Sequence, residues 1–416
     1  MVDGPSAIAP CIVCAAGKVQ VFLDLGETAY ANAFPTAEDI AQGREEKFPL
    51  TVGHCPDCHH VQLTQHAPPS DLFSHYLYMS SASATLVGHL KGLAKTIVSR
   101  YGAQAAGLVL DVGCNDGTLL SGFAEVGAAR VLGIDPAANL APVARERGVE
   151  VVTDFFNAET ARRLKIENGE ASIITLTNSF PHIPDLAGLC RGFDHLLSDD
   201  GVIVLEAHYL GDLVDMLAFD TVYHEHVSYW SLGPARRLFA AHGFEVVDVE
   251  RLPIHHGQLR LWVRRAGRET VSERTMALLE AEKTRGFGRL ETFQAFAGAI
   301  DQIKSSVTDW LAQAKANGEM VVGYGAPAKG NTLLGYLQVG PDDLKYIADL
   351  NQLKQGRFTP GTHIPVLAPD QLLRDQPDFL LILAWNFVDE IVAQQKAYAD
   401  GGGRFFVPVP ALREVF

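Results

Sequence analysis

The segment 222–231 reads VYHEHVSYWS and places Tyr223, His224, Glu225 and His226 next to one another among apolar residues. Imidazole and carboxylate groups can bind a metal, carry a proton or take part in hydrogen bonds. These residue types are therefore compatible with a metal site and with an acid/base site. They are equally compatible with a polar loop in which a histidine is a packing residue with satisfied hydrogen bonds.

Four of the six cysteines form two CxxC pairs, CIVC and CPDC. In a reducing compartment such pairs indicate metal binding rather than disulfides, and two of them complete the tetrahedral Cys₄ shell that structural Zn²⁺ favours. Redox-active or incidental CxxC pairs are the alternative, and His59 or His60 could replace a cysteine. We predict a structural zinc site, with the ligands Cys11, Cys14, Cys55 and Cys58.

A metal ion is the weaker interpretation for the segment 222–231. His224 and His226 would share one face of a strand, but they would point apart on a helix. The sequence offers no evident third ligand at a suitable spacing, and the cysteines already provide a metal site. We therefore favour the acid/base interpretation.

Size and charge limit the class of protein. The chain has 416 residues, of which 34 are basic and 49 are acidic, giving a net charge of −15. The length predicts two or three domains, and the negative charge argues against a nucleic-acid partner. Because there is neither a long apolar run nor a signal-peptide pattern, we expect a cytoplasmic protein without a membrane partner.

The elements that would position a site begin with the apolar run 108–110, which is followed by DVGCNDG at 111–117. This pattern predicts a buried parallel strand that turns into a helix. A second strand ends at Asp135, where a carboxylate can take both ribose hydroxyls, and later strands also end in polar residues. The candidates at this edge of the sheet are Asp111, Gly113, Cys114, Asn115, Gly117, Asp135, Asp154, Asn178 and His182.

This part of the chain resembles a class I S-adenosylmethionine-dependent methyltransferase. Three residues separate Gly113 from Gly117 in LDVGCNDG, a spacing that departs from the dinucleotide fingerprint GxGxxG. The spacing argues against an NAD-dependent oxidoreductase. The candidates above, apart from His182, would bind S-adenosylmethionine.

A second parallel α/β unit is expected to begin near residue 320. It follows a helix with apolar residues at spacings of three and four, and it opens with MVVGYGAPAKGNTLL, a strand followed by a glycine-rich turn. Cations in this unit could hold a diphosphate, although surface lysines on a structural lobe are the alternative. The candidate substrate-binding residues are Lys329, Asn331, Lys354, Arg357, Trp385 and Asn386.

The motifs CIVC, CPDC, LDVGCNDG, NSFPHIPD, YHEHVSYWSL, GYGAPAKGNTLL and LKQGRFTPGTHIP occur in the order found in the sugar C-methyltransferases of antibiotic and deoxysugar pathways. The chain resembles that family over nearly its whole length, although Gln352 stands where the family commonly carries proline. The resemblance implies an α/β fold with three domains. They are an N-terminal Cys₄ zinc lobe (1–68), a central class I methyltransferase domain (69–270) and a C-terminal Rossmann-like domain that binds a nucleotide sugar (271–416).

The resemblance also implies methyl transfer from S-adenosylmethionine to carbon 3 of a dTDP-linked 4-keto-6-deoxy sugar. Such chemistry needs a base that removes the proton beside the ketone and a donor that stabilises the enolate. The comparison with the family implies His226 as the base, with His224 as the second choice. Tyr223 or Glu225 would orient the base or steady the enolate, and His182 would bind the ketone or a sugar hydroxyl.

Two other functions are compatible with parts of this pattern. An O- or N-methyltransferase acting on a sugar or another small metabolite needs no enolate and usually has no second nucleotide-binding lobe. A non-catalytic binding or scaffold protein with a degenerate methyltransferase fold would not need Asp111, Asp135 or the acid/base cluster. The second parallel α/β unit argues against the first alternative. The presence of Asp111, Asp135 and the acid/base cluster argues against the second.

Overall fold

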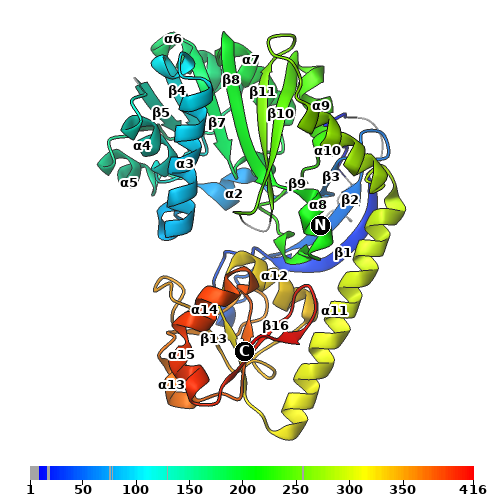
Figure 1. The fold of residues 1–416 in the computed structure, drawn as a ribbon. Helices are drawn as coiled ribbons and strands as arrows, with labels where there is room; N and C mark the ends of the chain where they lie inside the picture. Colours follow the sequence, from blue (N-terminus) through cyan, green and yellow to red (C-terminus); the bar gives the residue numbers. More distant parts are fainter. Residues whose placement is uncertain (1–8, 16–18, 75, 77, 129, 255–256) are drawn as a thin grey trace.

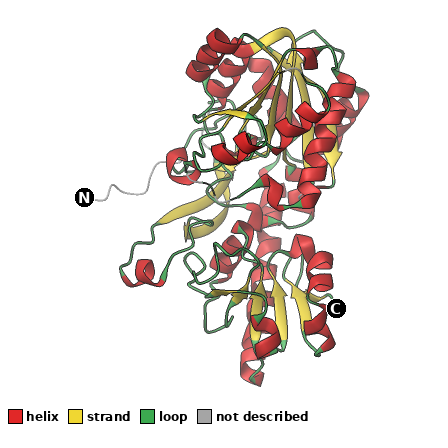
Figure 2. Ribbon diagram, turned by 90° about the vertical axis from the view of Figure 1, so that its left-hand side faces the viewer, coloured by secondary structure: helices red, strands yellow, loops and turns green. Residues whose placement is uncertain are grey.

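The computed structural model describes residues 9–15, 19–74, 76, 78–128, 130–254 and 257–416. These residues form three β-sheets. In Figure 1 the seven-stranded sheet and its helices are at the top, the six-stranded sheet is at the bottom, and the blue strands of the N-terminal sheet lie between them. The turned view in Figure 2 shows the same vertical order.

The N-terminal sheet has four antiparallel strands in the order β1-β2-β3-β9. Its last strand, β9, comes from the centre of the chain and lies within the segment 222–231, just after His226. This pairing could not be predicted from the sequence, because a strand of two residues has no recognisable period. The strands are β1 (Gln20–Ala29), β2 (Lys47–His54), β3 (Val61–Leu63) and β9 (Ser228–Tyr229), and α1 (Ala37–Ala41) lies between β1 and β2.

The central sheet has seven strands in the order β10-β11-β8-β7-β4-β5-β6. β11 runs antiparallel to β8 and β10, and the other neighbours are parallel, as the predicted buried parallel strands require. All five residues of β4 are buried, because helices cover both faces of the sheet. The strands are β4 (Leu108–Val112), β5 (Arg130–Ile134), β6 (Glu150–Val152), β7 (Ala171–Thr177), β8 (Leu197–His208), β10 (Phe244–Leu252) and β11 (Gln258–Arg265).

Helices connect the strands of this sheet and shape its edge. They are α2 (Pro69–Phe73), η1 (Ser80–Ala82), α3 (Ala84–Arg100), η2 (Gln104–Ala106), α4 (Thr118–Glu125), α5 (Ala141–Glu146), α6 (Ala158–Asn168), η3 (Phe180–His182), α7 (Leu186–Leu196), α8 (Leu210–Asp215), η4 (Phe219–Thr221), α9 (Leu232–Ala241) and α10 (Glu273–Thr284). α10 packs against α9 and β10 and so belongs spatially to the central unit. The division of the chain at residue 270 stays a prediction.

The C-terminal sheet has six strands in the order β14-β13-β12-β15-β16-β17, of which only the pair β16-β17 is antiparallel. The strands are β12 (Val321–Tyr324), β13 (Ile347–Ala348), β14 (Val366–Leu367), β15 (Phe379–Ile382), β16 (Arg404–Val407) and β17 (Arg413–Glu414). The helices are α12 (Ala328–Leu337), α13 (Gln371–Asp375), η6 (Trp385–Phe387), α14 (Val388–Gln394) and α15 (Lys396–Asp400). A second parallel α/β unit after residue 320 is therefore confirmed.

The long helix α11 (Leu290–Asn317) runs along one side of the molecule and joins the two α/β units. Its predicted apolar stripe is buried, including Phe293, Ile300 and Val307. Trp310 at the end of the stripe is only partly buried and packs against Phe379. Within the described part of the chain, no helix combines the length and the apolar character that crossing a membrane requires.

Candidate active site and metal centre

A cavity of about 890 Å³ is lined by residues from the N-terminal, central and C-terminal parts of the chain. Asn32 comes from the N-terminal segment, Asp111 and His226 come from the central unit, and Lys329 and Lys354 come from the C-terminal unit. The volume lies in the upper part of the range for small-molecule sites. The cavity therefore brings the three predicted parts of the site together.

The glycine-rich turn after β4 forms one wall of the cavity, called the cofactor wall because the cofactor is predicted to bind there. Gly113 adopts φ +73°, and a Cβ atom there would lie 2.6 Å from the Cβ of Ser179, so only glycine fits. Gly117 does not line the cavity, but at φ +75° it makes the turn into α4 possible. The other predicted cofactor residues that line the cavity are Asp111, Cys114, Asn115, Asp135, Asp154 and Asn178.

Two buried carboxylates define this wall. Asp135, at the end of β5, accepts hydrogen bonds from the backbone N–H groups of Asn115 and Ala137, both at 2.8 Å. Asp111 accepts a hydrogen bond from the Thr175 hydroxyl at 2.7 Å, and burial raises the pKa of Asp111 to about 7. The backbone thus orients Asp135 at the end of β5, where the sequence predicts a carboxylate that takes the ribose hydroxyls.

The other polar residues of this wall are partly engaged by the protein. The side chain of Asn115 accepts a hydrogen bond from the backbone of Ser80 and donates one to the carbonyl of Tyr78. Asp154 forms an ion pair with Arg163 at 2.8 Å, and the half-exposed Asn178 accepts a hydrogen bond from Gln258. Asn115 therefore contributes to this wall mainly through its backbone, whereas Asp154 and Asn178 keep polar groups at the cavity.

His226 lies in the cavity wall with both ring nitrogens in hydrogen bonds. Its Nδ1 lies 2.8 Å from the carbonyl oxygen of Thr221, and its Nε2 lies 2.9 Å from the hydroxyl of Tyr223. A carbonyl can only accept, so Nδ1 carries the proton and Nε2 holds a free electron pair that accepts from Tyr223. This is the tautomer in which Nε2 can act as a base.

His182 and His208 surround the ring of His226. The ring of His182 stacks on that of His226 at 5.1 Å between centroids, and the ring of His208 lies at 5.2 Å. Burial lowers the pKa of both His182 and His226 to about 3, with further lowering by the neighbouring histidines. Both rings are therefore neutral at neutral pH, which leaves the electron pair on Nε2 of His226 free, while the same burial weakens that ring as a base.

His224 and Glu225 do not line the cavity. The ring of His224 packs edge-on against Tyr30 at 5.3 Å between centroids. Glu225 is 4% exposed and accepts hydrogen bonds from Asn32 at 2.6 Å and from Tyr76 at 3.1 Å. Glu225 thus links the N-terminal segment to residues 222–231, which are called the acid/base segment below. The Thr221 carbonyl, and not a carboxylate, sets the tautomer of His226.

The predicted substrate-binding residues divide into two groups. Lys329, Lys354 and Asn386 line the cavity, whereas Asn331, Arg357 and Trp385 do not. Asn331 donates to the carbonyl of Ala31, and Arg357 donates to the carbonyl of Phe34, so both join the C-terminal unit to the N-terminal segment.

The two lysines in the cavity are largely buried. Nζ of Lys354 donates to the carbonyl of Ala326 at 2.7 Å, and Nζ of Lys329 lies 3.6 Å from the centroid of the Trp385 ring. Burial lowers the pKa of Lys329 to about 8 and also lowers the pKa of Lys354. Two cations in a partly desolvated wall favour an anionic ligand.

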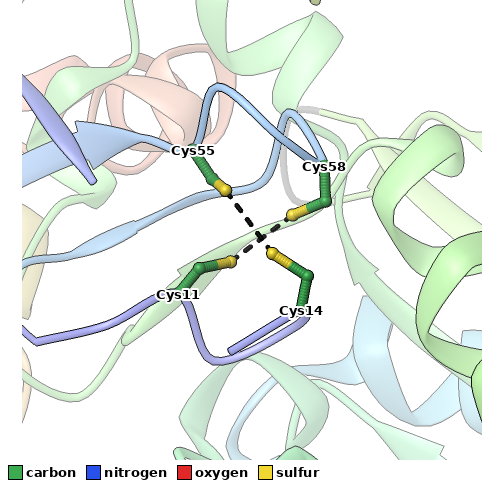
Figure 3. Close-up of side chains that lie close together, drawn as sticks. All are labelled: Cys11, Cys14, Cys55 and Cys58. Atoms are coloured by element: carbon green, nitrogen blue, oxygen red, sulfur yellow. Dashed lines mark hydrogen bonds between the residues drawn. The ribbon is translucent and has the colours of Figure 1, made fainter. Parts of the chain in front are cut away.

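The four predicted zinc ligands form one cluster beside the N-terminal sheet, shown in Figure 3. The Sγ atoms of Cys11 and Cys58 lie 3.4 Å apart, those of Cys14 and Cys55 lie 3.6 Å apart, and all four lie within 4.8 Å of one another. A zinc tetrahedron with bonds of about 2.3 Å has edges of about 3.8 Å. The cluster fits Zn²⁺.

The two histidines considered as substitute ligands lie outside this cluster. The ring of His60 packs against Trp230 at 4.6 Å between centroids, and the ring of His59 stacks on His54 at 5.7 Å. Among the described residues, the group that can hold a metal ion consists of the four cysteines.

Sequence reasoning did not select several residues of the site. His208, the last residue of β8, was predicted to lie at the end of a parallel strand, as was Asn178, but it was not chosen as a site residue. Asn32 and Tyr76 reach Glu225 over long distances in the sequence, and nothing in their local pattern indicates it. The Thr221 carbonyl is a backbone group, which the residue type does not reveal.

Three family models match consecutive parts of the chain. The model described as "Putative zinc binding domain" matches residues 11–73, "Methyltransferase domain" matches 86–249 and "C-methyltransferase C-terminal domain" matches 253–410. Together with the cysteine cluster and the cofactor wall, these matches define a zinc-containing, S-adenosylmethionine-dependent C-methyltransferase.

The C-methyltransferase NovU of Streptomyces niveus is 35% identical over 416 residues, which are 100% of this chain and 99% of that protein. A ubiquinone biosynthesis O-methyltransferase of Xanthomonas oryzae pv. oryzae is 33% identical over 103 residues, 24% of this chain and 43% of that protein. The crystal structure of magnesium protoporphyrin IX methyltransferase from Synechocystis has 16% identity and a TM-score of 0.34, and the match covers 43% of this chain and 83% of that one. The full-length identity to NovU shows that the chain belongs to the C-methyltransferase family.

Proposed function

We propose that the protein transfers the methyl group of S-adenosylmethionine to carbon 3 of a dTDP-linked 4-keto-6-deoxy sugar. The observation that carries the proposal is the pair His226–Tyr223, a neutral imidazole and a hydroxyl 2.9 Å apart in the wall of a cavity shared with Asp135 and Lys329. Carbon methylation beside a ketone needs a base and a hydrogen-bond donor, which this pair supplies. The bound cofactor supplies an electrophilic methyl carbon.

The proton chemistry follows from the tautomer of His226. Without substrate, the Tyr223 hydroxyl donates to Nε2. In the proposed reaction Tyr223 turns to donate to the ketone oxygen, and Nε2 takes the proton from carbon 3. The electron pair of that C–H bond forms the enolate and then the new bond to the methyl carbon, and the sulfur leaves with the electron pair of its bond to the methyl group.

Other residues would bind and orient the sugar. His182, stacked on His226, would donate to the ketone or to a sugar hydroxyl. Lys329 and Lys354 would bind the diphosphate, because both residues line the C-terminal half of the cavity. Asn386 lines the same half and would bind the nucleotide portion. Asn331 and Arg357 would hold the C-terminal unit against the N-terminal segment, and Trp385 would support Lys329.

Solvent exchange tests the proposal before any methyl transfer. The protein is incubated in D₂O with a dTDP-4-keto-6-deoxy sugar and S-adenosylhomocysteine, and deuterium at carbon 3 is followed by NMR. We expect exchange in the unaltered protein and a loss of at least about 100-fold in His226→Ala, the size typical of general-base removal. His224→Ala, in which the ring lies outside the cavity, is the matched control.

Two results would contradict the proposal. Exchange at an equal rate in His226→Ala would remove His226 from the role of base. Methylation of an oxygen or nitrogen atom without exchange at carbon 3 would favour the O- or N-methyltransferase alternative.

A further inference from the structure

The short helix η4 attaches the acid/base segment to the C-terminal unit. Its three residues, Phe219, Asp220 and Thr221, are all buried. η4 packs against α12, where the ring of Phe219 meets that of Tyr336 edge-on at 5.3 Å between centroids. The chain that enters the segment of Tyr223 and His226 is therefore held by the C-terminal unit.

Asp220 lies at the centre of this contact and is 0% exposed. Its Oδ2 accepts a hydrogen bond from Nε1 of Trp385 at 2.7 Å and lies 3.7 Å from Nζ of Lys329. The same Nζ lies 3.6 Å from the centroid of the Trp385 ring. These three side chains form one cluster, and it joins the central unit to the C-terminal unit.

Burying two charged groups in this cluster carries a desolvation cost. Burial raises the pKa of Asp220 and lowers the pKa of Lys329, while the attraction between the two charges opposes both shifts. Apolar side chains of similar size often stabilise a contact as well as a buried ion pair does. The charged groups do, however, fix the geometry of the contact, because a charge-assisted hydrogen bond is directional.

The fixed geometry reaches the base within one residue. Thr221 follows Asp220 in the same turn, and its carbonyl oxygen accepts a hydrogen bond from Nδ1 of His226 at 2.8 Å. A shift of Asp220 would move this carbonyl, and the preference of His226 for the tautomer with a free Nε2 would weaken. Thr221 itself also lines the cavity.

We propose that Asp220, held by Trp385 and Lys329, is a positioning residue through which the C-terminal unit sets the tautomer and orientation of His226. Lys329 also lines the cavity, so an anionic ligand in the C-terminal half meets the ammonium group that holds Asp220. The base is thereby tied to the half of the cavity that receives the substrate. The inference rests on the proposed role of His226.

The first test observes His226 directly and needs no substrate. In protein labelled with ¹⁵N-histidine, the Nδ1–H signal of His226 is assigned by its loss in His226→Gln. We expect Asp220→Ala to shift or broaden this signal and to add population of the other tautomer. Trp385→Phe keeps a ring over Lys329 but removes the donor to Asp220, so it should give the same change more mildly.

A matched control separates positioning from general loss of stability. Nε1 of Trp262 donates to Glu250 at 3.1 Å within the central hairpin, away from the cavity. Trp262→Phe removes the same type of hydrogen bond and should leave the His226 signal in place. Affinity for S-adenosylhomocysteine should stay within about twofold in all three variants, because the residues of the cofactor wall come from elements other than η4.

The second test measures the base step. Exchange of the carbon 3 proton should fall on the order of 10- to 100-fold in Asp220→Ala, the usual loss for a displaced reacting group, and less in Trp385→Phe. If folded Trp385→Phe and Asp220→Ala keep both the His226 signal and the exchange rate of the unaltered protein, the inference is wrong. Because the NMR signal requires no sugar, failure of the proposed substrate leaves that first test intact.

Discussion

Replacement of Asn32 by alanine tests how the N-terminal segment supports the active site. Nδ2 of Asn32 donates to Oε1 of Glu225 at 2.6 Å, and the carboxylate is 4% exposed. A hydrogen bond to a charged group contributes about 1.5 to 3 kcal/mol. Asn32→Ala removes this contribution. The carboxylate keeps one donor, the Tyr76 hydroxyl at 3.1 Å, so it is not left without a hydrogen bond.

A loss of about 2 kcal/mol in the free energy of unfolding corresponds to a fall in melting temperature of about 4 to 8 °C for a cooperative unit of about 150 to 250 residues. Differential scanning calorimetry measures it. Asn32→Asp should be worse than Asn32→Ala, because it places a second carboxylate beside Glu225. Combining it with Glu225→Gln restores an amide–carboxylate pair with donor and acceptor exchanged, so the double variant should recover part of the loss.

The effect of Asn32→Ala should also depend on pH. Burial raises the pKa of Glu225, while the hydrogen bonds from Asn32 and Tyr76 lower it. A raised pKa means that the protonated form favours folding at low pH and that this contribution disappears as the pH rises through the pKa of the folded state. Removing a donor raises the pKa further, so the difference from the unaltered protein should grow as the pH rises above the usual pKa of a glutamate. Equal melting temperatures for Asn32→Ala and Asn32→Asp would refute the reasoning.

Three other changes probe the metal, the cofactor wall and the lysines. Cys55→Ser should leave well under about one equivalent of zinc by metal analysis and lower the melting temperature, and a full equivalent would contradict a Cys₄ site. Gly113→Ala should weaken binding of S-adenosylhomocysteine at least about tenfold by calorimetry, since φ is +73° and a Cβ atom would meet Ser179. Lys354→Met should raise KM for the nucleotide sugar about tenfold and leave affinity for S-adenosylhomocysteine unchanged, whereas a change in kcat alone would argue against a diphosphate contact.

The elements that the sequence predicted well are those with a local signal. The two CxxC knuckles fix their own geometry, and the strand ends near Asp111 and Asp135 follow from apolar runs that stop at polar residues. Topology then brings such strand ends to one edge of a sheet, so the sequence could predict that these residues lie together in one cavity wall.

Contacts between distant segments could not be predicted in this way. Trp385 and Lys329 follow apolar elements of the C-terminal unit, and their pattern suits a ligand as well as it suits Asp220. The same limit applies to His224 and His226, which have the same side chain and similar neighbours. Only the three-dimensional packing puts one ring against Tyr30 and the other in the cavity.

The pairing of β3 with β9 also constrains the order in which the chain can fold during synthesis. The cysteine knuckles and β1, β2 and β3 leave the ribosome early, but Ser228 and Tyr229 follow only after most of the central sheet has been made. Until then β3 presents an open edge, the kind of surface on which nascent chains aggregate. Early capture of zinc would hold the first three strands together through this interval, and the arrival of β9 would close the sheet and bring the adjoining His226 into place in the same event.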